Sequence, residues 1–156
     1  MTESTTETGV VTKLSPRSVA DTAAKLTGMI DAKGMRLFAL IDQREEAQHA
    51  GLDLRDTILV IFGSPAAGTP VMAASPLAAL DLPLKVLVWD DEGQTKVSYY
   101  SPDELAARHH LGPGLAANLA GVNALTDALV APLPRGPRAL LAGSSEDPDA
   151  DLYPAR

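Results

Sequence analysis

The sequence predicts an α+β fold, in which a mostly antiparallel sheet of four to five strands is covered by helices in a single domain. Short apolar or alternating segments at residues 35–41, 57–62, 84–89 and 95–100 are typical of strands. Residues 18–33 and 113–130 carry apolar residues at helical spacing. These strands and helices do not alternate strictly, which favours an antiparallel sheet over a parallel one.

The expected domain covers residues 9–131. Residues 1–8 contain no apolar residue after Met1, and residues 132–156 are rich in proline, glycine and acidic residues. Such segments bury too little apolar surface to offset the entropy of ordering. We therefore expect both termini to be disordered.

The first half of the domain is expected to begin with a strand at residues 10–14. Ser18 and Asp21 are spaced as a capping box, which starts a helix that Gly34 ends. Residues 35–41 form a second predicted strand, with apolar residues on both faces. A short polar helix at 44–50 and a buried central strand at 57–62 come next.

The second half of the domain is expected to contain an antiparallel hairpin. Residues 84–89 and 95–100 flank the acidic turn 90–93, which predicts a loop of four or more residues. Ser101, Pro102 and Glu104 have the pattern of a helix start. The last helix is predicted to run from Pro113 to Val130.

Composition excludes several kinds of partner. The formal net charge is -7, and lysines and arginines do not form the basic stripe that nucleic-acid binding requires. The apolar runs are far shorter than the ~20 residues that cross a bilayer. The first residues lack the pattern of an export signal. We therefore expect a cytoplasmic protein that binds neither nucleic acid nor membrane.

No metal or cofactor is expected. Cysteine is absent, which excludes disulfides and thiolate ligands. His109 and His110 are adjacent, so on a helix they point in different directions and are best interpreted as surface or helix-end residues. The acidic residues at 90–92 lack the spacing of a calcium loop and are better explained as a solvated turn.

The segment IFGSPAAGTPVMAASP, residues 61–76, is partly similar to a phosphate-binding loop. The lysine of such loops is absent and Pro70 removes an amide, so we exclude nucleotide hydrolysis. Ser64 is not a nucleophile elbow, because Phe62 stands where that motif needs glycine. The segment is then either a tight turn in which Thr69 caps the next element, or a glycine loop whose amides contact a ligand.

The stretches LFALIDQ, GLDLRDTILVIFGSPAAGTPVMAASP and LDLPLKVLVWDDEGQTKVSYYSPDELAARHHL resemble a bacterial and archaeal family, domain of unknown function 302. The likeness runs from about Leu14 to Val130. It implies an α+β fold, a homodimer and an unassigned biochemical role. Members of the family typically carry histidine where Gln43 stands and asparagine where Ser64 stands. Gln43 cannot transfer protons but can still form hydrogen bonds, which weakens an enzymatic interpretation.

These observations leave three hypotheses about function. The first is a noncatalytic, homodimeric module with a small-ligand cleft where two neighbouring strands end, lined by Asp42, Gln43, Phe62, Gly63, Ser64, Gly68 and Thr69. The second is an enzyme that uses Asp42, or Glu45 with His49, as acid and base. Glu45 and His49 are also spaced as an ordinary surface pair. The third is a module that acts through protein contacts, with residues 132–156 as a tether.

Overall fold

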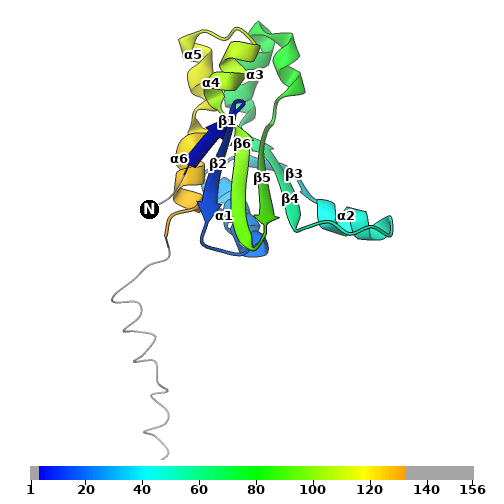
Figure 1. The fold of residues 1–156 in the computed structure, drawn as a ribbon. Coiled ribbons are helices and arrows are strands. Elements are labelled where there is room, and N and C mark those ends of the chain that lie inside the picture. The colour runs from blue at the N-terminus through cyan, green and yellow to red at the C-terminus, as the bar shows by residue number, and fades with distance from the viewer. Residues whose placement is uncertain (1–3, 133–156) are drawn as a thin grey trace, which may run out of the picture.

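Residues 4–132 are described by the computed structural model of the chain, in which helices cover one face of a six-stranded sheet (Figure 1). The strand order is β1-β2-β6-β5-β4-β3, and all neighbours are antiparallel. The α+β class and the antiparallel sheet are therefore confirmed. The strands are β1 (Ser4–Glu7), β2 (Val10–Ser15), β3 (Arg36–Asp42), β4 (Thr57–Gly63), β5 (Leu84–Asp91) and β6 (Gln94–Tyr100).

Strand β1 was not expected, and the prediction that residues 1–8 lack order is wrong for Ser4–Glu7. Its backbone pairs with β2, and such pairing needs no apolar side chains. Thr8 and Gly9 both have positive φ (51° and 78°), which matches the two-residue turns that join hairpin strands. A Cβ on Gly9 would lie 2.5 Å from Glu104 Cγ, so any other residue here would have to displace the Glu104 side chain. The disorder predicted for residues 132–156 concerns a segment of which residues 133–156 lie outside the described part of the chain.

The main core lies between the sheet and two helices, α1 (Val19–Ala32) and α6 (Gly121–Leu129). Figure 1 shows α1 behind the sheet, and α1 contacts α6 as well as β3, β4 and β5. Ser18 accepts a hydrogen bond from the Asp21 amide at 3.0 Å, so the predicted start of α1 is confirmed. The core side chains are almost fully buried, each stabilising the fold by about 1.5–3 kcal/mol. They include Leu26, Ile30, Val60, Phe62, Val86, Val88, Val97, Leu125 and Leu129.

The opposite face of the sheet is called here the open face. Side chains alternate along a strand, so the neighbours of the core residues point away from α1 and α6. Leu59 pairs with Leu87 and Ile61 with Lys85 across β4 and β5. All four of these side chains are only half-buried. The open face is defined by Val10, Leu59, Ile61, Lys85, Leu87, Trp89 and Tyr100.

A group of short helices, called here the helical cap, lies at the end of the sheet where β4 ends and β5 begins (Figure 1). It has a small core of its own, formed by Val71, Ala78, Leu105 and Leu119. The remaining helix, α2 (Gln43–His49), projects from the opposite end of the sheet. The cap consists of α3 (Pro65–Ala74), η1 (Pro76–Leu80), α4 (Pro102–Arg108), α5 (Pro113–Ala116) and η2 (Ala117–Leu119).

Two predicted elements differ in detail from the structure. The helix expected at 113–130 is divided into α5, η2 and α6, because Leu119 is buried in the cap whereas Val122 is buried in the main core. The loop of the β5–β6 hairpin has two residues, Glu92 and Gly93, both with positive φ. The expected longer loop is wrong because Asp91 remains in the ladder, where Lys96 binds its carboxylate at 2.6 Å.

Candidate functional site

Residues 61–76 form a junction between a strand and a helix rather than a tight turn. Strand β4 ends at Gly63, Ser64 is the N-cap of α3, and Pro65 is the first helical residue. Neither Gly63 nor Gly68 has a positive φ, and Thr69 lies inside the helix, where it caps nothing. The tight-turn interpretation is therefore wrong, because Pro65 at the first helical position favours a helix start.

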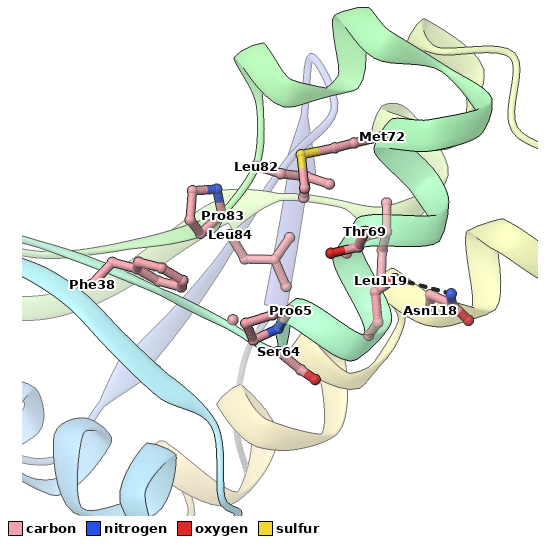
Figure 2. A pocket seen from close by; sticks show the side chains of 13 residues that line it. Phe38, Ser64, Pro65, Thr69, Met72, Leu82, Pro83, Leu84, Asn118 and Leu119 are labelled. Atoms are coloured by element: carbon pink, nitrogen blue, oxygen red, sulfur yellow. Dashed lines mark hydrogen bonds between the residues drawn. The ribbon is translucent and has the colours of Figure 1, made fainter.

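A pocket of about 300 Å³ lies beside this junction (Figure 2). We call it the α3 pocket. Four of the predicted site residues line it, namely Gly63, Ser64, Gly68 and Thr69. The rest of the wall comes from β3, α3, the segment that enters β5, and η2. It is mostly apolar and consists of Phe38, Pro65, Ala67, Met72, Leu82, Pro83, Leu84, Asn118 and Leu119.

The polar groups of the α3 pocket are few and uncharged. The hydroxyl groups of Ser64 and Thr69 have no hydrogen-bond partner among residues 4–132. Asn118 donates a hydrogen bond to the Ala67 carbonyl at 3.0 Å, which ties η2 to α3 (Figure 2). An apolar pocket with a small number of free polar groups is the usual form of a small-molecule site.

Phe38 reaches the pocket because strand β3 is irregular. The pairing of β3 with β4 shifts between Leu37 and Ala39, and a bulge of this kind turns a side chain in a new direction. The Arg36 guanidinium lies 5.0 Å from the centre of the Phe38 ring. Sequence reasoning missed Phe38, because a period of two treats it as an ordinary strand position.

Asp42 and Gln43 are not part of this pocket. Asp42 pairs with Ile58, whereas Gly63 pairs with Arg36, so the two predicted halves of the cleft lie at opposite ends of the β3–β4 pair. For strands of this length the separation is roughly 20 Å. The prediction of a shared cleft is therefore wrong, because antiparallel neighbours place the end of one strand beside the start of the other.

The remaining predicted residues have structural positions. Phe62 belongs to the main core and is only 1% exposed. Asp42 caps α2 by accepting a hydrogen bond from the Glu45 amide at 3.0 Å. His49 Nε2 and Glu45 Oε1 are 4.0 Å apart, and both side chains are more than half exposed. Neither these two residues nor Asp42 lines the α3 pocket.

A partly buried polar cluster supports one wall of the α3 pocket. His109 Nε2 lies 2.6 Å from Asp81 Oδ2, and Arg108 Nη1 lies 3.0 Å from the same oxygen. Burial alone would raise the pKa of Asp81, but the hydrogen bonds from His109 and Arg108 outweigh it and lower that pKa. The cluster fixes α4 to the segment that carries Leu82 and Leu84.

Sequence reasoning did not find this cluster. His109 is the C-cap of α4, as the helix-end interpretation expected, but it is not a surface residue, because only 8% of its side chain is exposed. Asp81 and His109 are 28 residues apart, and no motif links them. Within residues 4–132, no group of three histidine, cysteine or acidic side chains could hold a metal ion. In the same range, no helix combines the length and the apolar character needed to cross a bilayer.

Comparison with known proteins identifies the family. The model of the family described as "Domain of unknown function DUF302" matches residues 11–129. A crystal structure of an uncharacterized conserved DUF302 protein from Bacillus stearothermophilus is similar, with a TM-score of 0.67 and 20% identity. The similarity covers 80% of this chain and 97% of that one.

Curated relatives include proteins named fluoride-specific ion channel FluC 1, from Brucella suis biovar 1 and Brucella abortus biovar 1. The chain is 38% identical to each over 107 residues, which is 68% of its own length. The match covers 42% of the first relative and 40% of the second. The chain therefore spans less than half the length of these relatives.

Proposed function

Because the chain belongs to the DUF302 family and the matched region contains every residue of the α3 pocket, we propose that it binds a small, mostly apolar molecule there. The proposed role is binding without catalysis. One observation carries it: the pocket of about 300 Å³ has apolar walls and two hydroxyl groups that no other described residue engages.

The lining of the pocket defines the class of ligand. A volume of 300 Å³ is at the lower end of the range for small-molecule sites, so a compact molecule fits best. Transferring an unpaired charge into an apolar site is costly, and no charged side chain lines this pocket. The ligand is therefore neutral, with one group that hydrogen-bonds to Ser64 or Thr69.

The probe that tests this proposal is p-cresol, a single ring with one hydroxyl group. At ten times its dissociation constant, a ligand that binds only the folded state stabilises it by about 1.4 kcal/mol. We expect p-cresol to raise the melting temperature of the wild type. We expect the charged analogue 4-methylbenzoate to bind the α3 pocket more weakly.

Two variants locate the effect of the probe. Gly68→Leu places a side chain in the pocket and should abolish the shift caused by p-cresol. Gln43→Ala lies at the opposite end of the β3–β4 pair and should leave the shift unchanged. A p-cresol shift that is equal in wild type and Gly68→Leu would contradict binding in the α3 pocket.

The relatives favour a second proposal, that the domain serves as an accessory unit beside a membrane channel. In the FluC relatives the matched residues are joined to a longer stretch of other sequence. Fluoride is not the ligand we propose for the α3 pocket, because a small anion would lose its hydration there without a charged partner. Melting temperatures in sodium fluoride and sodium chloride at equal ionic strength should therefore agree. A specific stabilisation by fluoride would contradict this assignment.

The homodimer implied by the family resemblance is also a proposal, and β3 is the surface that we assign to it. This strand is an edge of the sheet, and Leu37 and Leu40 on it are 41% and 45% exposed. An exposed apolar edge is a template for pairing with another chain. Leu40→Lys should convert a dimer to a monomer in analytical ultracentrifugation. A dimer that persists in this variant would exclude the β3 edge.

A further inference from the structure

We propose a second binding site, on the open face of the sheet, for an amphipathic molecule whose carboxylate pairs with Lys85. The site is a hollow of about 220 Å³. It shares no lining residue with the α3 pocket. Strands β2, β4, β5 and β6 contribute its walls, which include Val10, Leu59, Lys85, Leu87 and Tyr100.

Lys85 is a half-buried cation without a partner among residues 4–132. No ion pair or hydrogen bond engages its ammonium group in that part of the chain. Other lysines on the sheet differ, since Lys13 lies 2.8 Å from Asp127 and Lys96 lies 2.6 Å from Asp91. A cation held among apolar side chains gains stability when an anion reaches it.

The acidic group that lines a cavity together with Lys85 does not pair with it. Asp81 lines a small cavity together with Lys85, but the two make no ion pair within 4.0 Å. The Asp81 carboxylate is instead bound by His109 and Arg108. The positive charge of Lys85 therefore remains available to a ligand.

Tyr100 supplies a second free donor beside Lys85. Its hydroxyl group has no hydrogen-bond partner within the described chain, and the Arg108 guanidinium lies 5.0 Å from its ring centre. Ser98 is already engaged, because its hydroxyl contacts Thr12 at 2.8 Å and the Trp89 indole at 3.0 Å. The hollow therefore combines apolar walls with two free donors, which fits a carboxylate on a short apolar chain.

Charge favours a ligand over a second copy of the protein at this hollow. Across β5 and β6, Lys85 is the charge on the open face that lacks a counter-ion, since Lys96 and Asp91 neutralise each other. A second copy docked by the same surface would bring another unpaired lysine to it. A carboxylate supplies the opposite charge instead.

Octanoate is the probe, and Trp89 reports its binding. Trp89 is the only tryptophan of the sequence, and it comes after Lys85 and Leu87 on the same face of β5. We expect saturable quenching or enhancement of its fluorescence by octanoate. Octanol, which has the same length and no charge, should bind about tenfold more weakly or worse, because hydrogen bonds to charged groups are the stronger ones.

Variants test the role of Lys85 and distinguish the site on the open face from the α3 pocket. Lys85→Met and Lys85→Gln should remove the preference for octanoate over octanol, with melting temperatures that show intact folding. Lys33→Met is the matched control, since Lys33 is exposed after α1 and has no ion pair in residues 4–132. It should leave octanoate binding unchanged. Gly68→Leu, which fills the α3 pocket, should also leave it unchanged.

Several results would overturn this assignment. They are octanoate binding that survives in both Lys85 variants, equal binding of octanol and octanoate, or no saturable response of Trp89. A dimer that Leu87→Asp dissociates would show that a second copy covers the open face, and it would also overturn the ligand site. None of these results would affect the α3 pocket, which p-cresol tests.

Discussion

Replacing Gly68 by alanine is expected to stabilise helix α3. Gly68 lies inside this helix without a positive φ. An added Cβ would meet only Leu82 Cδ1 and Met72 Cε, both at 3.9 Å, which is ordinary van der Waals contact. Glycine inside a helix costs about 0.5–1 kcal/mol relative to alanine. Gly68→Ala should therefore raise the free energy of unfolding by about that amount.

Urea unfolding measures this change, and thermal unfolding should show a rise of about 2–6 °C. Gly28 offers a matched control inside α1, because a Cβ there would meet no atom within 4 Å. Gly28→Ala should give the same gain in stability without affecting the α3 pocket. The two substitutions thus share one physical cause and differ only in the atoms that lie beside the new methyl group.

The larger side chain of Gly68→Leu separates stability from binding. The pocket of about 300 Å³ gives it room, so the variant should fold but lose the response to p-cresol. Gly28→Leu should keep that response. If Gly68→Ala lowered stability by more than about 1 kcal/mol, the space beside Gly68 would not be open as described. If Gly68→Leu still bound p-cresol, the reasoning about this pocket would be refuted.

Three further predictions concern the scaffold. Although burial raises the pKa of Asp81, hydrogen bonds from His109 and Arg108 hold it below the ordinary value of about 4. Its stabilisation is therefore present above pH ~4 and lost as the pH falls through the folded-state pKa, and acid titration of Asp81→Asn should lack this component. Phe62→Ala should lower the free energy of unfolding by about 3–5 kcal/mol in urea, since Phe62 is 1% exposed. Asp42→Ala should weaken the α2 cap by about 1 kcal/mol, seen as faster amide exchange in α2 with p-cresol binding unchanged.

Local signals allowed much of the fold to be predicted. The cap at Ser18 and the apolar spacing after it predicted α1, and the observed helix is Val19–Ala32. The run at 57–62 predicted β4, observed at Thr57–Gly63. Strand β1 was missed because Ser4–Glu7 carries no apolar residue, although Gly9 marks the turn after it.

The site was predicted only in part, since it depends on relations between distant segments. Ser64, Gly68 and Thr69 were found because they come directly after a buried strand. Asp42 and Gln43 were misplaced because strand direction is not encoded in either segment alone. Met72 and Leu82 were missed because an apolar residue that lines a pocket has the same sequence pattern as one that fills a core.

Because helices cover only one face of the sheet, the two faces of strand β5 have separate roles. Leu84, Val86 and Val88 hold the scaffold on one side, while Lys85, Leu87 and Trp89 meet solvent on the other. Mutations at the odd positions can thus alter the proposed site on the open face at little expense to folding. A designer could diversify this row as a library and leave the even positions untouched.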